Sequence, residues 1–528
     1  MATHEPALGP DNTNSCKSDS VTTEVTQTKD ESESRYMFTD KTRPKTASQR
    51  LLGSVWDAFG KEPVERRFVL RLDRFLFIYS LLSLIIKTLD QSNISNAYVS
   101  GMKEDLALYG QERNLFSTFF NMGYLFGSLP CQIIINRGMR PSVWLPACEL
   151  IWSGLVMSIA LCKNARPIYA IRFFIGLFES SVFPGFVLIL GSWYTPDELG
   201  KRIALFELSG QAASMFSGYL QAGLYSSMNG RHGIAGWKWL FIVDGIISIP
   251  IALAGFYCIP DFPTNTCARW LNADQREYAI QRMLAVGRKP PTKLTMSEMI
   301  KIFKSPRPWL FLLPYNISFF GYYTGYFNLW LKAVGHYTVE QINLVPTAGN
   351  AIGVIMAYVV GTLSDQTGNR WVWMLLSLVP ATVGAIILSV WYVPEGAVMF
   401  ANLFAFASSP LQPLTITWAA ECFQDSAATR GLIVGFGNTV SFAMSAWTGL
   451  VFFPTPDAPH YKFGYQAAVG FQILAAISIL VFLKYVKWEE KKFRMVKNEF
   501  GLMVRLEDLV LARPETTKST EDEENCIR

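Results

Sequence analysis

The run FLFIYSLLSLIIKTLDQSNISN, residues 75–96, decides the fold class of this chain. It is apolar and uncharged until Lys87, and it is long enough for a helix to cross the roughly 30 Å hydrocarbon core of a bilayer. Its second half nevertheless carries Asp90, Asn93 and Asn96. Ionisable groups at membrane depth are costly, so by default they face a bundle interior or a water-filled path. The run therefore predicts a transmembrane helix with one functional polar face.

Further runs of similar length and composition follow along the chain. They are continuously apolar and do not alternate with polar residues, which favours helices over the strands of a barrel. The sequence predicts an all-α polytopic membrane protein with twelve transmembrane helices, at 75–96, 115–135, 143–161, 168–191, 203–226, 238–258, 309–332, 345–364, 371–391, 398–420, 431–453 and 463–485.

The composition supports this fold class. The 528 residues are 50% hydrophobic and only 17% charged, whereas about a quarter of the residues are charged in an ordinary globular protein. The eight cysteines are scattered without paired spacing, so no disulfide framework, metal site or cofactor is implied. Residues 1–60 lack the short apolar core of a secretory signal, and the first span is expected to direct its own insertion.

Lys and Arg residues near the span ends predict the orientation of the chain. Basic clusters lie before the first span (61–74), between the sixth and seventh spans (269–307) and after the last span (484–494). An even number of spans places all of them on one side, which is the cytoplasmic side by the positive-inside rule. Both termini are therefore expected in the cytoplasm. The net charge of +5 is a topology signal rather than a sign of nucleic-acid binding.

The central basic block divides the spans into two sets of six. Many secondary transporters have this plan, with the substrate site near the membrane midplane between the two halves. The expected divisions are a disordered cytoplasmic N-terminal tail (1–70), an N-terminal six-helix half (71–258), a cytoplasmic central loop (259–308), a C-terminal six-helix half (309–486) and a cytoplasmic C-terminal tail (487–528).

A loop motif supports the division into halves. The stretch GTLSDQTGNR links the eighth and ninth spans and places Gly361, Asp365, Gly368 and Arg370 in the order G-x-x-x-D-x-x-G-x-R. It resembles the cytoplasmic loop signature of the major facilitator superfamily, in which glycines permit a tight turn and the Asp caps or pairs with neighbouring helix ends. The matching loop of the first half, INRGMRP, has no Asp. The resemblance implies the major facilitator fold, with a gating role for the second-half motif.

Four further stretches carry a closer resemblance: SNAYVSGMKEDL, AIRFFIGLFES, LGSWYTPDELGKR and GIAGWKWLFIVDG. They resemble the fungal allantoate permease branch of that superfamily, the anion:cation symporters, and within it the pantothenate and biotin permeases. The resemblance implies proton-coupled uptake of a small organic anion at the plasma membrane. Pantothenate or a related vitamin-like carboxylate is favoured, while biotin, nicotinate, allantoate or a small peptide remain alternative substrates.

Charged residues of the first half are the main candidates for coupling. Arg172 and Glu179 lie two turns apart in the fourth span and so share a face. An Arg can bind a carboxylate bidentately, and protonation of Glu179 or Asp90 would then couple to substrate binding. An internal salt bridge that locks the helix is the alternative for Arg172 and Glu179. Asp90 has the alternative of a structural pair with Lys87, three residues away, whereas Asn93 extends the polar face.

Three more acids within spans have weaker claims. Glu149, Glu207 and Asp244 are expected to be mainly structural, because charges near helix ends often pair with loop arginines.

The second half offers aromatic and amide side chains. The seventh span carries Gly321 and Gly325, and a broken helix near the midplane is a common place for a substrate site. An aromatic belt that faces lipid is the alternative. The substrate-binding candidates of this half are Tyr322, Tyr326 and Asn328 in the seventh span, Gln412 and Trp418 in the tenth, and Asn438 in the eleventh.

Other classes of protein fit less well. A membrane enzyme would need a cluster of catalytic side chains, and the four histidines are not paired with a spaced nucleophile. A channel would need a filter-like repeat, which the sequence lacks. A non-transporting nutrient sensor on a carrier fold remains an alternative. The sequence thus predicts a symporter, not an enzyme, whose partners are a small organic anion, a proton and the lipid bilayer.

Overall fold

The computed structural model describes residues 56–136, 139–285, 296–390, 392–423, 427–492, 495–497 and 503–505. Most of the expected N-terminal tail (1–70) and C-terminal tail (487–528) lies outside these residues. The boundary of the N-terminal tail differs from the prediction, because Pro63–Leu72 forms helix α2, which buries Phe68, Val69 and Leu72.

The N-terminal half is a bundle of long helices that covers the first six predicted spans. A π-helical turn (Asp73–Phe77) joins α2 to the first of them, and a second π turn (Tyr98–Met102) leads into the short α4 (Lys103–Asp105). The long helices are α3 (Ile78–Ala97), α5 (Glu112–Asn136), α6 (Pro141–Ser158), α7 (Ala165–Glu179) with its continuation α8 (Val182–Trp193), α9 (Pro196–Met228) and α10 (Gly236–Cys258).

The C-terminal half covers the other six predicted spans, and two of its spans are broken. Its helices are α13 (Pro306–Phe320) followed by α14 (Phe327–Val334), α15 (Val339–Thr367), α16 (Arg370–Ser389), α17 (Glu395–Ala405) followed by α18 (Leu411–Cys422), α19 (Ala427–Phe452) and α20 (Gly464–Lys492). The expected central loop is partly helical, with α11 (Ala273–Ala285) and α12 (Met296–Lys304). The last described residues pair Met495–Lys497 (β1) with Met503–Arg505 (β2) in antiparallel fashion.

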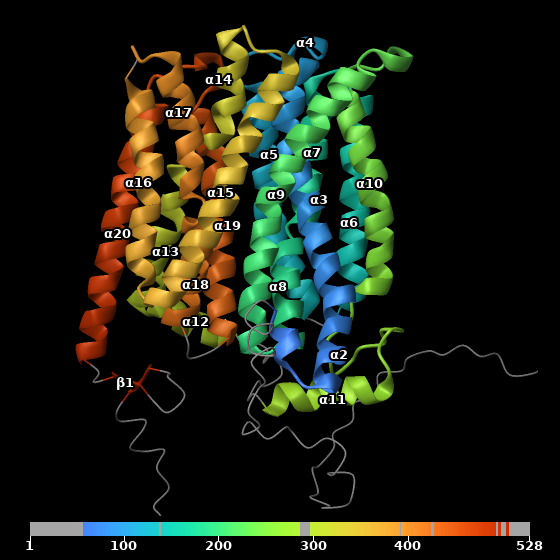
Figure 1. Ribbon diagram of the computed structural model, residues 1–528, viewed down its shortest axis with the longest axis vertical. Coiled ribbons are helices and arrows are strands. Elements are labelled where there is room, and N and C mark those ends of the chain that lie inside the picture. Colours follow the sequence, from blue (N-terminus) through green and yellow to red (C-terminus); the bar gives the residue numbers. More distant parts are fainter. Residues whose placement is uncertain are drawn as a thin grey trace, which may run out of the picture.

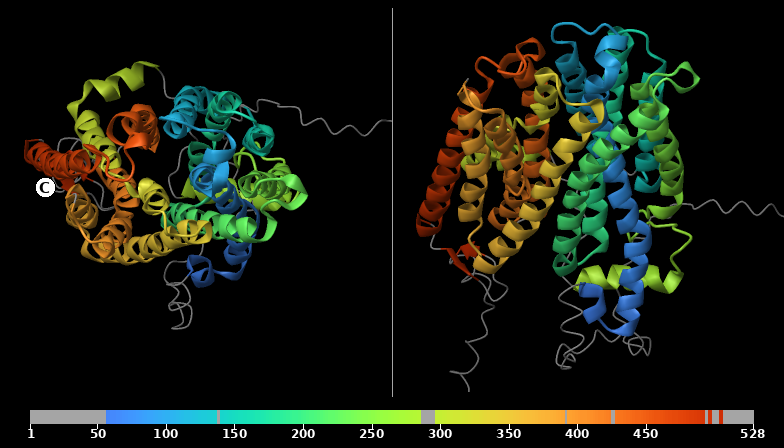
Figure 2. Two further views of the ribbon diagram at one scale, coloured as in Figure 1. Left: turned by 90° about the horizontal axis from the view of Figure 1, so that it is seen from above. Right: turned by 45° about the horizontal axis from the view of Figure 1, so that its top comes forward.

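The two halves stand side by side with their helices roughly parallel (Figures 1 and 2). Helices α4 and α14 lie at one end of the molecule, which we call the α14 end, and α2, α11 and α12 lie at the other, the α11 end (Figure 1). Among the described residues, six helices are long and apolar enough to cross a membrane on their own length and composition. The predicted all-α membrane fold is confirmed.

Hydrogen bonds fasten the two halves together toward the α14 end. Asn114 of α5 donates to the backbone oxygens of Gly449 at 2.9 Å and Phe453 at 2.7 Å. Deeper in the bundle, the hydroxyl groups of Ser128 and Thr439 meet at 3.0 Å. The structure is therefore closed at the α14 end.

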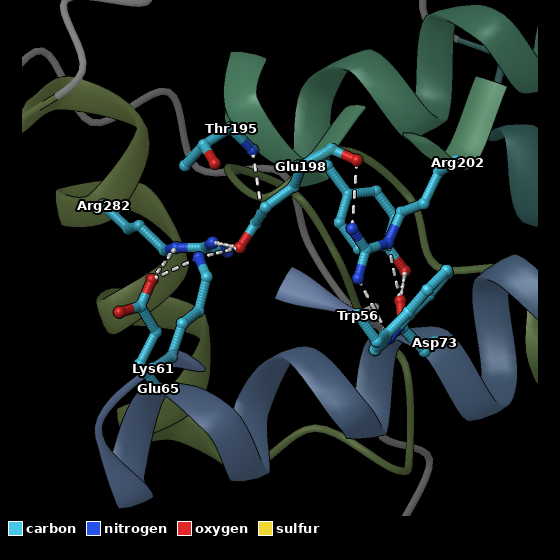
Figure 3. A network of polar contacts seen from close by, with 9 residues as sticks. Trp56, Lys61, Glu65, Asp73, Thr195, Glu198, Arg202 and Arg282 are labelled. Atoms are coloured by element: carbon cyan, nitrogen blue, oxygen red, sulfur yellow. Dashed lines mark hydrogen bonds and ion pairs between the residues drawn. The ribbon is translucent and has the colours of Figure 1, made fainter. Parts of the chain in front are cut away.

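A network of ion pairs ties α2 and α11 to the N-terminal half at the α11 end (Figure 3). Glu198, at the start of α9, pairs with Lys61 and with Arg282 of α11, and Glu65 of α2 lies 3.3 Å from Arg282. Burial by itself raises the pKa of the Glu198 carboxyl, but the charges of Arg282 and Lys61 outweigh it and hold this pKa below its ordinary value. The network makes α11 a part of the N-terminal unit.

A second group of contacts in the same region surrounds Asp73. Arg202 of α9 binds this carboxylate through two nitrogens at 2.7 and 2.8 Å. The indole of Trp56 and the hydroxyl of Tyr194 donate to it at 3.0 and 2.9 Å. Every lone pair of the buried charge thus has a donor, which is the condition under which a buried ion pair is tolerated.

Candidate functional site

Buried ionisable side chains from α3, α7 and α10 meet inside the N-terminal half. Asp90, Arg172, Glu179 and Asp244 are each no more than 2% exposed. Asp90 lies within electrostatic range of the other three. Four ionisable groups in the interior of one membrane-embedded half are costly for stability, so their presence indicates function.

Arg172 of α7 has no carboxylate partner in the part of the chain that the structure describes. Its guanidinium carbon lies 4.7 Å above the centre of the Phe120 ring, and its Nε atom is buried without a hydrogen-bond acceptor. Glu179 is close enough to interact electrostatically, but its Oε1 accepts a hydrogen bond from Gln91 instead. The alternative of an internal salt bridge between Arg172 and Glu179 is therefore not formed.

Lys87 and Asp90 do not pair either, which corrects the structural alternative drawn from their spacing. The Lys87 ammonium lies 5.1 Å above the ring of Tyr124, on α5. That ring stacks on Phe442 of α19 at 3.7 Å, and Asn438 of α19 donates to the Tyr124 hydroxyl at 3.4 Å. Lys87 thus points toward the interface between the halves, whereas Asp90 points toward α10.

The carboxyl groups of Asp90 and Asp244 face each other across α3 and α10, within reach of a shared hydrogen bond once one of them carries a proton. In the charged form both groups only accept, and the Asp90 oxygens have no other donor in the described residues. Asp244 accepts hydrogen bonds from Asn93 at 2.5 Å and Ser248 at 3.3 Å. Such a carboxyl pair is suited to hold one proton between two oxygens.

The sequence led us to expect that Glu149, Glu207 and Asp244 pair with loop arginines. This expectation is wrong for the contacts that the structure shows. Glu149 accepts hydrogen bonds from Tyr79 and Ser83 of α3, both at 2.8 Å. Asp244 is bound as described above. Glu207 lies within electrostatic range of Lys87, with one carboxylate oxygen unpaired. The contacts that these acids make in the described residues therefore lie inside the bundle and not with loop residues.

Two of the second-half candidates line a cavity of about 220 Å³ at the α14 end. Tyr326 stacks on Phe453 at 4.5 Å, with the Arg113 guanidinium 5.2 Å from its ring. Tyr322 belongs to the same wall. Asn328 instead reaches the N-terminal half, where it donates to Asn96 at 2.9 Å.

The break in the seventh span lies where the glycines predict it. Helix α13 ends at Phe320 and α14 begins at Phe327. A Cβ added to Gly321 would lie 2.4 Å from the side-chain amide nitrogen of Gln472, so a larger residue here would require the Gln472 side chain to move.

The two candidates of the tenth span are not brought together. Trp418 is 6% exposed and packs between Phe311 and Phe482, at ring distances of 6.1 and 4.9 Å. It belongs to the core of the C-terminal half. Gln412 is exposed on the same helix. Asn438 is the second-half candidate that contacts Tyr124, the residue whose ring Lys87 also contacts.

The loop motif forms contacts within the C-terminal half. Gly368 ends α15 with a φ of +65°, a left-handed conformation that favours glycine. Arg370 pairs with Asp365 and, at 2.9 Å, with Glu421 of α18. Gly361 has nothing within 4 Å of the position where a Cβ would lie. The gating role of the motif stays a prediction.

Sequence reasoning missed several residues that complete the site. Ser217 of α9 hydrogen-bonds Asn93 and Asn96, both at 2.7 Å, and Tyr124 separates Lys87 from α19. A hydroxyl within an apolar run gives only a weak signal, because Ser and Tyr occur there for packing as well.

Comparisons with known proteins bear on the whole chain. The model of the Major Facilitator Superfamily matches residues 80–449. The MFS transporter PfmaC of Pestalotiopsis fici is 37% identical over 446 residues, which are 82% of this chain and 83% of that protein. The pantothenate transporter liz1 of Schizosaccharomyces pombe is 32% identical over 460 residues, 84% of this chain and 87% of that protein. A crystal structure of a D-xylose-proton symporter superposes with a TM-score of 0.59 at 12% identity, over 77% of this chain and 96% of that one.

Proposed function

Because this chain belongs to the Major Facilitator Superfamily, we propose that it imports a small organic anion together with a proton, and that pantothenate is the anion. A relative with 32% identity over most of both chains is a pantothenate transporter, which supports the substrate. The D-xylose-proton symporter supports the fold alone.

The observation that carries the proposal is the unpaired, buried Arg172. A charge in a membrane interior normally has a partner, because desolvation of an isolated charge is costly. Arg172 has acids nearby but no hydrogen bond to them in the described residues. A guanidinium offers a fork of donors that fits a carboxylate, and pantothenate carries one carboxylate. The substrate then supplies the missing acceptor.

The charge of the site favours proton coupling. Asp90 and Glu179 lie within electrostatic range of the Arg172 guanidinium, and Asp244 lies within range of both of these acids. A bound anion would therefore add negative charge to a region that already contains three acids. Uptake of one proton by the Asp90 and Asp244 pair offsets that added charge. Anion and proton therefore bind together more favourably than either binds alone, which is the thermodynamic basis of symport.

The orientation follows from the basic clusters. The α11 end carries Lys61, Arg202 and Arg282, and we place it in the cytoplasm by the positive-inside rule. The bonded α14 end then faces the outside of the plasma membrane. The structure corresponds to a state closed to the outside, and transport proceeds by rocking one half against the other around the site.

Uptake measurements test the proposal. Labelled pantothenate is offered to fungal cells that lack their own pantothenate carrier, at acidic and at neutral external pH, with biotin, nicotinate and allantoate as competitors. Saturable uptake that is faster at acidic pH, is abolished by an uncoupler and resists the three competitors supports the proposal. Competition by biotin alone would identify a biotin carrier instead. Binding without uptake would favour the nutrient sensor.

A further inference from the structure

A chain of hydrogen bonds runs from the C-terminal half to the carboxyl pair of the N-terminal half. Asn328 of α14 donates to Asn96 of α3 at 2.9 Å. Asn96 donates to Ser217 of α9 at 2.7 Å, and Ser217 donates to Asn93 at 2.7 Å. Asn93 then donates to Asp244 of α10 at 2.5 Å. The chain crosses the interface between the halves once, at its first link.

Every donor in this chain points toward Asp244. The side-chain oxygens of Asn96 and Asn93 each accept from the preceding residue and their nitrogens donate to the next, so all hydrogen bonds of the row run in the same direction. Hydrogen bonds in such a row polarise one another, and each link strengthens the next. The last donor therefore stabilises a charged carboxylate more strongly when the first link is present. Ser217 and Asn93 are fully buried, so water does not replace a lost link there.

The carboxyl pair has charged neighbours on the surrounding helices. Asp90 lies opposite Asp244, and Arg172 and Glu179 of α7 are within electrostatic range. The acid of α6, Glu149, is held by Tyr79 and Ser83, and the acid of α9, Glu207, lies toward Lys87. The Asn93 amide and the Ser248 hydroxyl are the hydrogen-bond donors that reach Asp244 within the described residues.

We propose that this row of hydrogen bonds makes release of the coupling proton depend on closure of the α14 end, with Asn328 as the positioning residue. The inference rests on the proposed symport function. When the α14 end opens, Asn328 separates from Asn96, the row loses its first donor, and the carboxyl pair retains a proton. When the end closes, the row is completed and the charged carboxylate is stabilised. The O–H bond of the acid then breaks and the proton passes to water on the α11 side.

A matched pair of variants tests the role of Asn328 in proteoliposomes. Asn328→Ala removes the first link of the row. Asn343→Ala removes another hydrogen bond between the halves near the α14 end, from Asn343 to Ser100 at 2.9 Å, which does not lead to the carboxyl pair. Two rates are measured with labelled pantothenate: net uptake driven by a proton gradient, which requires proton release, and exchange against internal pantothenate, which does not.

We expect Asn328→Ala to lower net uptake about tenfold while exchange stays within about twofold of the wild type. Asn343→Ala changes both rates by the same factor. Asn328→Gln keeps the donor and restores part of the net uptake. An equal loss of net uptake and exchange in Asn328→Ala, or the same selective loss in Asn343→Ala, would overturn the proposal.

An infrared titration separates failure of this inference from failure of the proposed substrate. The absorption of protonated carboxyl groups is followed with pH in the purified full chain, and the part that Asp244→Asn removes is assigned to the pair. We expect this band to disappear at a higher pH in Asn328→Ala than in the wild type or Asn343→Ala, by about half a unit. An unchanged band in Asn328→Ala overturns the inference even if pantothenate is transported. A shifted band supports it even if another anion is the substrate.

Discussion

Replacement of Arg172 by Ala removes the group that we assign to the substrate carboxylate. A hydrogen bond to a charged group contributes about 1.5–3 kcal/mol, and every 1.4 kcal/mol corresponds to a factor of ten. Loss of the guanidinium fork should therefore reduce pantothenate uptake at low substrate concentration by roughly 10–100-fold. The fold should persist, because no salt bridge or hydrogen bond of the described residues depends on this side chain, which is held by its contact with Phe120.

The assay is initial uptake rate over a range of pantothenate concentrations, normalised to the amount of protein at the cell surface. Arg172→Lys keeps the charge but loses the fork, and its uptake should fall between those of the wild type and Arg172→Ala. Arg231, which is exposed in the loop after α9, provides the control, since Arg231→Ala should transport normally. Uptake by Arg172→Ala within about twofold of the wild type at equal surface amount would refute the assigned role.

Three further predictions concern stability and packing. Glu198→Ala leaves Arg282 without its main partner and should lower the free energy of unfolding by about 3 kcal/mol, measured by thermal unfolding of the purified protein. Because the pKa of Glu198 is lowered in the folded state, its contribution to the free energy of unfolding is present at neutral pH and is lost as the pH falls through that lowered pKa. The wild type should therefore lose more stability on acidification than Glu198→Ala. Equal losses in the two proteins would contradict the assignment. Trp418→Ala should cost about 3–5 kcal/mol without a change in the KM for pantothenate, whereas a large rise in KM would return Trp418 to the substrate site. A Cβ on Gly218 would lie 2.6 Å from the backbone oxygen of Asn343, so Gly218→Leu should strongly reduce uptake. Gly223→Leu should not reduce it, because nothing lies within 4 Å of a Cβ at that position. Equal uptake by the two variants would show that close contact of α9 with α15 is unnecessary.

The positions of the membrane helices could be predicted because apolar length is a local property of the sequence. The membership in the superfamily, predicted from short motifs, is confirmed by the match over residues 80–449. The sequence did not predict helix α2, because its segment is rich in charged residues and Phe68 and Val69 are buried only by tertiary contacts. The charged run looks like a tail until α11 and α9 pack against it.

The candidate site could be predicted only in part. Helical spacing shows which residues share a face, as for Lys87 and Asp90, but it does not show what that face meets. The pairing of Asp90 with Asp244 joins helices that are far apart in sequence, so no local pattern reveals it. Trp418 illustrates the same limit, because the sequence pattern of a tryptophan near prolines is the same for a residue that lines a substrate path and for one that packs in a hydrophobic core.

The most direct test of the central claim is a simultaneous record of substrate and proton movement. Pantothenate is added to lightly buffered, de-energised cells or proteoliposomes that contain the protein, and the external pH is followed together with uptake of the label. Symport predicts that the external medium becomes more alkaline as the label enters, and that Arg172→Ala shows neither change. Entry of pantothenate without any movement of protons would contradict the account.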